Sequence, residues 1–142
     1  LFFEVAFFWG IGGGINALIT PDIPNSFPDP QYILFFFGHG LLIIAIAYAC
    51  ISLANRPTFN SVKNGIYFSL ITLPVIYSIN KILGPPANYW YLGSKPVGDS
   101  ILNLFPAPPL HIPFLIIIGV ILFFLIYSPY WVYDSFKKQD VQ

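Results

Sequence analysis

The stretch QYILFFFGHGLLIIAIAYACISL, residues 31–53, contains no Asp, Glu, Lys or Arg. A helix needs about 20 consecutive apolar residues to cross the ~30 Å hydrocarbon core of a bilayer. The stretch therefore predicts a transmembrane helix. It carries one imidazole, His39, between Gly38 and Gly40.

Three further segments have the same apolar character and a similar length, namely residues 1–20, 65–83 and 111–133. Of the 142 residues, 56% are hydrophobic and 8% are charged. Soluble domains carry about 25% charged residues, so this chain could not cover a globule with a solvated surface. We predict an all-α, polytopic transmembrane helix bundle with about four spans, forming a single transmembrane domain over residues 1–142.

The charge and cysteine content narrow the possible partners. The formal net charge of zero argues against nucleic-acid binding. The single cysteine, Cys50, permits no internal disulfide. The two histidines, His39 and His111, fall on different predicted spans without a ligand cluster, so no metal site is expected. No cofactor is expected either, and membrane lipids are the expected partners.

The connections between the predicted spans differ in character. Residues 21–30 hold four prolines and form a stiff loop. Residues 84–110 are rich in proline and aromatic side chains but are neither long nor apolar enough to span. Irregular backbone is not stable against lipid, so this segment is expected to lie at the interface or among the helices.

Lysine and arginine placement predicts the orientation of the chain. Arg56 and Lys63 occupy the 54–64 loop, and Lys137 and Lys138 follow the last span. Because cytoplasmic loops carry an excess of these residues, loop 54–64 and the C-terminus are predicted to be cytoplasmic. Lys81 and Lys95 then fall on the outer side.

His39 is the strongest candidate for a functional residue within the spans, because placing an ionisable side chain inside a bilayer costs free energy and such residues are often functional. One interpretation is a neutral histidine that bridges two helices. The other is a general acid or base, because imidazole titrates near neutrality. Cys50 lies eleven residues away, about 16 Å along a helix, which exceeds the ~3 Å that a nucleophile and its base require. Any nucleophile for His39 must come from another helix.

Small residues recur at four-residue spacing in the first span, at Ala6, Gly10 and Gly14. Such a small-xxx-small ridge lets a second helix approach closely. We therefore expect these three positions to serve helix packing.

The 84–110 segment concentrates polar and aromatic groups at Asn88, Tyr89, Trp90, Tyr91 and Lys95. Tyrosine and tryptophan favour the level of the lipid headgroups, so an aromatic belt at the interface would explain them. A lysine among amides and phenols is also suited to binding a lipid phosphate.

Three stretches together resemble one known family. LFFEVAFFWGIGGGINALITPD (1–22), RPTFNSV (56–62) and NKILGPPANYWYLGSKPVGDSILNLFPAPP (80–109) are similar to the YwaF-type bacterial integral membrane proteins, and the similarity covers nearly the whole chain. The resemblance implies residence in the bacterial inner (cytoplasmic) membrane. It also implies that further helices precede residue 1, so that this chain corresponds to the C-terminal four of about six or seven.

The animal relatives of that family are described as acyltransferases that move a fatty acyl chain onto a phospholipid through a cysteine acyl-enzyme. The resemblance therefore implies that His39 is the catalytic acid/base, working with a cysteine on an upstream helix. It also implies a substrate and headgroup site, with the residues Asn80, Asn88, Tyr89, Tyr91 and Lys95. The alternative is a noncatalytic membrane subunit that packs through its helices onto a larger membrane complex.

Overall fold

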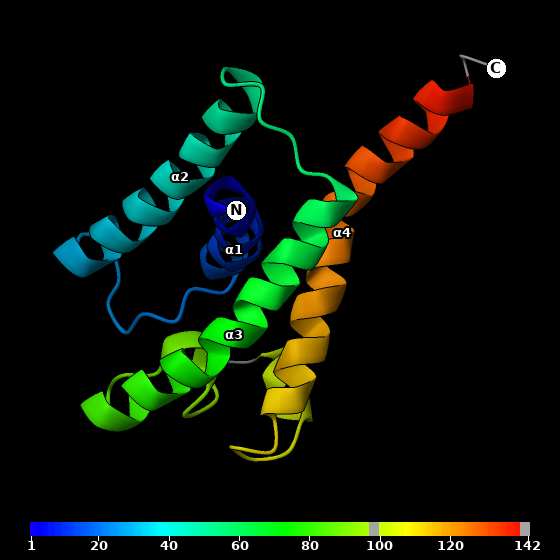
Figure 1. The fold of residues 1–142 in the computed structure, drawn as a ribbon. Helices are drawn as coiled ribbons and strands as arrows, with labels where there is room; N and C mark the ends of the chain where they lie inside the picture. The colour runs from blue at the N-terminus through cyan, green and yellow to red at the C-terminus, as the bar shows by residue number, and fades with distance from the viewer. Residues whose placement is uncertain (97–99, 140–142) are drawn as a thin grey trace.

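The computed structural model describes residues 1–96 and 100–139, and within them every regular element is helical. Residues 97–99 of the predicted interfacial segment lie outside this part of the chain. The elements are the long helices α1 (Phe2–Ile19), α2 (Pro30–Ile51), α3 (Phe59–Leu83) and α4 (Ile112–Gln139), and the short 3₁₀ helices η1 (Tyr89–Tyr91) and η2 (Ile101–Leu104). Figure 1 shows the four long helices, each long and apolar enough to cross a membrane. The predicted all-α bundle of four spans is confirmed.

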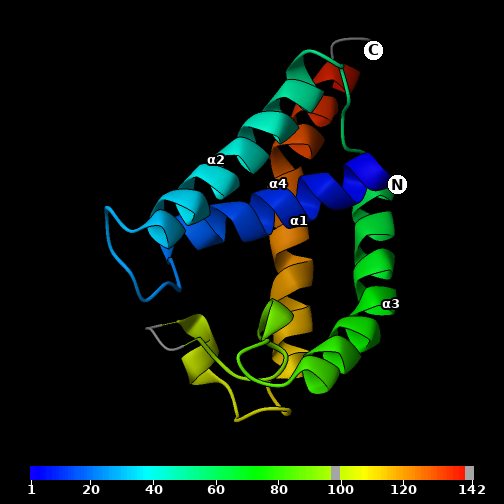
Figure 2. The same cartoon turned by 90° about the vertical axis from the view of Figure 1, so that its left-hand side faces the viewer.

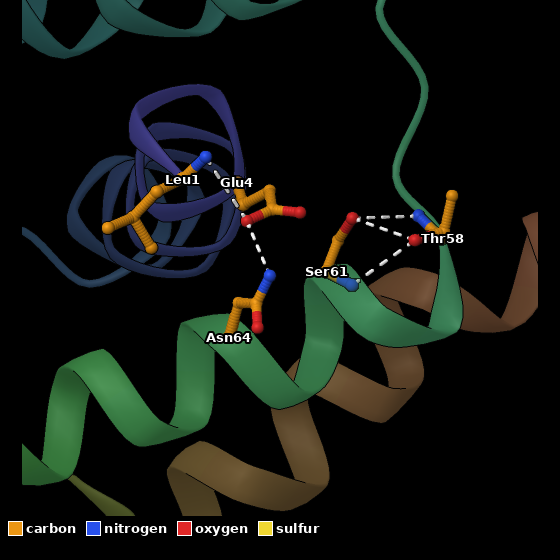
Figure 3. Close-up of polar contacts among 5 residues, drawn as sticks. All are labelled: Leu1, Glu4, Thr58, Ser61 and Asn64. Atoms are coloured by element: carbon orange, nitrogen blue, oxygen red, sulfur yellow. Dashed lines mark hydrogen bonds and ion pairs between the residues drawn. The ribbon is translucent and has the colours of Figure 1, made fainter.

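Helix α3 begins at Phe59, six residues before the start expected from hydropathy, because a capping box precedes it. The Thr58 hydroxyl accepts a hydrogen bond from the Ser61 backbone N–H at 3.3 Å, and the Ser61 hydroxyl accepts one from the Thr58 N–H at 3.0 Å (Figure 3). These bonds satisfy donors that the first turn of a helix leaves unpaired. Asp29 does the same for α2, where its carboxylate accepts from the Gln31 N–H at 2.7 Å.

Helix α4 runs six residues beyond the predicted end at residue 133, and Pro129 lies inside it. A proline in a helix removes the N–H that would bond the carbonyl four residues earlier. Here the Ser128 hydroxyl donates to that carbonyl, Leu125 O, at 2.8 Å. A side chain thus replaces the missing backbone donor, and the helix continues.

Helix α1 holds the central position. It packs against α2, α3 and α4, while α3 and α4 pack against each other and α2 lies chiefly on α1. Figure 2 shows α1 lying across α4 at a steep angle. The 52–58 linker and the last turns of α4 occupy one end of the bundle, and the segment after α3 occupies the other (Figure 1).

The core is a small cluster at the crossing of the four helices. Its buried members are Phe7, Phe8, Ile46, Val62, Phe123 and Tyr127. The rings of Phe8 and Phe123 stack at 4.8 Å, and Gly65 lets both approach α3, since a Cβ there would lie 3.1 Å from Phe123 and 3.2 Å from Phe8. Large apolar side chains stay exposed along all four helices, as a lipid environment favours.

Candidate functional site

His39 lies in the middle of α2, where its imidazole is half-buried. Its Nδ1 is 2.8 Å from the carbonyl oxygen of Phe35, one turn earlier, and its ring lies 4.4 Å from the Phe35 ring. A carbonyl only accepts, so this bond places a proton on Nδ1, and in the neutral imidazole the lone pair then lies on Nε2. Within the part of the chain that the structure describes, the Phe35 bond is the only hydrogen bond of His39.

The glycines beside His39 face open space. A Cβ added at Gly38 or at Gly40 would meet no heavy atom within 4 Å. These positions therefore do not accommodate another helix among the described residues. They leave a bare backbone surface on both sides of the imidazole.

Among the described residues, no thiol or hydroxyl is hydrogen-bonded to His39. Cys50 lies on the same continuous helix, so the separation expected from the sequence stands. Five serine and threonine hydroxyls inside α3 and α4 donate to carbonyls of their own helices. These hydroxyls are those of Ser69, Thr72, Ser78, Ser128 and Ser135.

Two of the predicted headgroup residues, Asn80 and Asn88, stabilise the conformation of residues 84–110, which we call the outer segment after its predicted side of the membrane. The buried Asn80 amide, at the end of α3, donates to Tyr89 O at 2.9 Å and accepts from the Tyr89 N–H at 2.8 Å. The Asn88 carboxamide accepts from the Gly93 and Ser94 N–H groups, both at 3.0 Å, and donates to Ser94 O at 2.9 Å. Both amides therefore replace regular backbone pairing in an irregular stretch.

Tyr91 joins three parts of the chain. Its hydroxyl donates to the Asp22 carboxylate in the α1–α2 loop at 3.2 Å. Its carbonyl accepts from Nε2 of His111 at 2.7 Å. Burial raises the pKa of the Tyr91 phenol above its usual value, and the charge of Asp22 raises it further. The phenol therefore stays protonated and remains a donor.

His111 is a structural residue that sequence reasoning missed. It precedes α4 and is fully buried, and its Nδ1 has no hydrogen-bond partner in the described structure. The bond to the Tyr91 carbonyl requires a proton on Nε2. The only sequence signal was a histidine at the start of an apolar run.

Lys95 and Tyr89, the remaining predicted headgroup residues, keep polar groups without a partner among the described residues. The Lys95 ammonium donates to the carbonyl of Phe105, which leaves two of its three N–H groups without a protein partner in the described structure. The Tyr89 side chain is exposed. Lys95 and the Tyr89 phenol are thus the groups of the outer segment most available to a ligand.

The small residues of α1 differ among themselves. A Cβ at Gly10 would collide with Ile46 of α2, and one at Gly14 would lie 3.1 Å from Ile43. Ala6 is exposed instead. The close approach of α1 and α2 thus depends on the two glycines.

Glu4 links the opposite end of α1 to α3. Its carboxylate accepts from the Asn64 amide at 3.0 Å and lies 3.4 Å from the Leu1 nitrogen (Figure 3). Asn64 belongs to the turn that follows the capping box of α3. The contact holds the beginnings of α1 and α3 together.

The family comparison accords with this architecture. The profile of the TMEM164 family matches residues 1–127. A search of curated proteins found no match, and a search of solved structures found none. The narrower resemblance to YwaF-type bacterial proteins stays a prediction. The chain is an integral membrane protein that belongs to the TMEM164 family.

Proposed function

We propose that this chain supplies the acid/base of a membrane lipid acyltransferase, and that His39 is that residue. The observation that carries the proposal is the state of its imidazole. The tautomer is fixed by Phe35 O, and the Nε2 lone pair is unused beside the bare backbone of Gly38 and Gly40. An imidazole with a fixed tautomer and one free nitrogen is prepared to accept a proton.

The nucleophile of this proposal is a cysteine on a helix upstream of residue 1. Its thiol gives its proton to His39 Nε2 as sulfur attacks the acyl carbonyl carbon of a lipid ester. The C–S bond forms, the C–O bond to glycerol breaks, and the proton passes from Nε2 to the departing oxygen. In the second half, an acceptor hydroxyl gives its proton to Nε2 and attacks the thioester, and the released thiolate recovers the proton.

The outer segment would hold the lipid headgroup in this proposal. Lys95 and the Tyr89 phenol would contact the phosphate, because both retain unused donors. Asn80, Asn88 and Tyr91 would position them, since the two amides bond backbone groups of the segment and the Tyr91 hydroxyl bonds Asp22 of the first loop.

The test compares His39→Ala and His39→Gln with wild type in cells that express equal amounts of protein. General acid–base catalysis contributes about 10²–10⁴-fold, so acyl transfer should fall by at least about 100-fold in both variants. Mass spectrometry of the phospholipid acyl chains is the measurement. Unchanged acyl composition in both variants would overturn the proposal.

A matched pair of glycine variants tests the bare surface beside His39. Gly38→Leu would place a side chain where a substrate must approach, whereas Gly119→Leu adds the same side chain at an open position of α4. We expect Gly38→Leu to reduce acyl transfer and Gly119→Leu to leave it unchanged. Equal activity of the two variants would contradict a substrate path at Gly38.

A noncatalytic subunit is the second candidate, and the exposure of α2 favours it. This helix packs chiefly on α1, and most of its surface is open to lipid or to another protein. Purification in mild detergent distinguishes the two functions. A protein that migrates alone, without a stoichiometric partner, would exclude the subunit.

A further inference from the structure

A shallow pocket lies at the end of the bundle opposite the outer segment. Its volume is about 440 Å³, and it is lined by Arg56, Pro129, Tyr130 and Tyr133. Arg56 belongs to the linker between α2 and α3, and the other three residues belong to the last part of α4. The pocket is thus formed where the linker crosses α4.

The depth of the pocket in the membrane follows from the length of α4. Tyr130 and Tyr133 lie 18 and 21 residues after Ile112, the first residue of that helix. At 1.5 Å per residue these separations correspond to about 27 and 32 Å. The hydrocarbon core is about 30 Å thick, so with Ile112 at one boundary and α4 along the membrane normal, the pocket lies near the other boundary, next to the lipid phosphates. This placement holds for either orientation of the chain.

The Arg56 guanidinium is held in place but not saturated. Its Nη2 donates to the Asp134 carboxylate at 2.6 Å and to Tyr130 O at 3.3 Å. The rings of Tyr130 and Tyr133 lie 5.6 and 5.1 Å from its central carbon. Nε and Nη1 have no partner in residues 1–96 and 100–139. The side chain is 41% exposed, so these donors are accessible.

This geometry points to a binding site for the phosphate of a membrane phospholipid, which we propose as a second function of the chain. The free Nε–H and Nη1–H groups can each donate to a phosphate oxygen, but as separate donors, because both forked edges of a guanidinium include Nη2. Pro129 and the tyrosine rings supply apolar surface for the adjoining glycerol and first methylenes, and tyrosine is favoured at this depth. The site does not depend on acyl transfer and lies at the other membrane face from Lys95.

Asp134 has a positioning role in this site. It directs the guanidinium over the pocket but also offsets part of its charge. Asp134→Asn would keep a hydrogen-bond acceptor for Nη2 and remove the negative charge. The variant should therefore bind an anionic phospholipid more tightly than wild type, whereas a purely structural ion pair would give no gain.

The test titrates the detergent-purified protein with phosphatidylglycerol and counts bound lipid by native mass spectrometry. We expect Arg56→Gln to raise the Kd about tenfold because it removes the positive charge, and Arg56→Lys to raise it less because it keeps that charge. Lys63→Gln is the control, since it removes a cation that contacts only the Phe59 ring in the described structure. It should change the Kd less than about twofold.

Each outcome decides the proposal. Equal effects of Arg56→Gln and Lys63→Gln would overturn it, as would weaker binding by Asp134→Asn. Inorganic phosphate at millimolar concentration should leave the lipid bound, because it lacks the apolar part of the ligand. Displacement by inorganic phosphate would overturn the assignment to a phospholipid. Circular dichroism melting of each variant checks that a loss of binding is not a loss of fold.

Discussion

Trp90 and Tyr91 adopt left-handed backbone conformations, with φ of 58° and 53°. Residues other than glycine rarely do so, and each costs about 1–3 kcal/mol. The contacts around them offset this cost. The Trp90 ring meets Trp9 of α1 edge-on at 4.8 Å, and Tyr91 bonds Asp22 and His111. The short η1 turn thereby connects α1, the first loop and α4.

Removal of the Tyr91 hydroxyl should change how stability depends on alkaline pH. The pKa of this phenol is raised above 10.0 in the folded protein, mainly by burial and then by Asp22. A raised pKa contributes stability that is complete below about pH 10 and is lost as the pH rises through the folded value. Tyr91→Phe should therefore show a smaller loss of stability between neutral and strongly alkaline pH than wild type.

Thermal unfolding in detergent over this pH range measures the effect. Tyr67→Phe is the matched control, because that side chain is exposed on α3. Coincident pH curves for the two variants would contradict a special role of the Tyr91 phenol.

At the scale of the elements, the contact between α1 and α2 depends on the glycines of residues 10–14. These glycines differ in what a side chain added at each position would meet. Gly10 and Gly14 face side chains of α2. A Cβ added at Gly12 would lie 3.0 Å from the Leu122 side chain of α4, and one added at Gly13 would meet no heavy atom within 4 Å. The run thus serves two helix interfaces. Small residues at such interfaces allow the close packing that holds membrane helices together.

Substitution in this run should have strongly position-dependent effects. Gly10→Leu should destabilise the fold by about 1–3 kcal/mol, because the added side chain overlaps Ile46 and forces α2 away. Gly13→Leu, three residues later in the same helix, should change stability by less than about 0.5 kcal/mol. Denaturation in mixed micelles compares the two. Equal destabilisation of the two variants would contradict a special role of Gly10 in the α1–α2 interface.

Hydropathy predicted the existence of all four helices but misplaced two of their ends. The early start of α3 depends on reciprocal bonds between Thr58 and Ser61, and the extension of α4 depends on the Ser128 hydroxyl behind Pro129. Both are local hydrogen-bonding effects at polar residues. The mean hydropathy of a window of residues does not detect such bonds, so it does not locate these helix ends. The 3₁₀ turns of the outer segment escaped prediction for the same reason.

At the scale of the whole molecule, the ends of the bundle alternate as the four-span prediction requires. Linker 52–58 and the end of α4 lie together, and the segment after α3 lies at the other end (Figure 1). Which end faces the cytoplasm stays a prediction from Arg56, Lys63 and Lys137.

Single cysteines should report this orientation. In a Cys50→Ser background, we expect Phe27→Cys in the first loop to react with a membrane-impermeant maleimide in intact cells. Asn55→Cys in the second linker should react only after the cells are permeabilised. Gel-shift labelling of the two variants is the measurement, and the reverse pattern would invert the topology.

Sequence reasoning named candidate polar residues in the 84–110 segment without their partners, and it did not single out the Arg56 pocket. The Asn80–Tyr89 pair and the Arg56–Asp134 pair join residues 9 and 78 positions apart. The first is close enough in sequence to suspect a turn. The second arises only when the linker crosses α4, which no local pattern reveals. The buried state of His111 depends likewise on how the outer segment folds over it.

The central position of α1 has a consequence for the order of assembly during synthesis. A chain enters the membrane from its N-terminal side, and domains form as they emerge. Within this stretch α1 is made first, and each later helix packs directly against it. Each of α2, α3 and α4 therefore finds a docking surface on a helix that is already present when it is inserted.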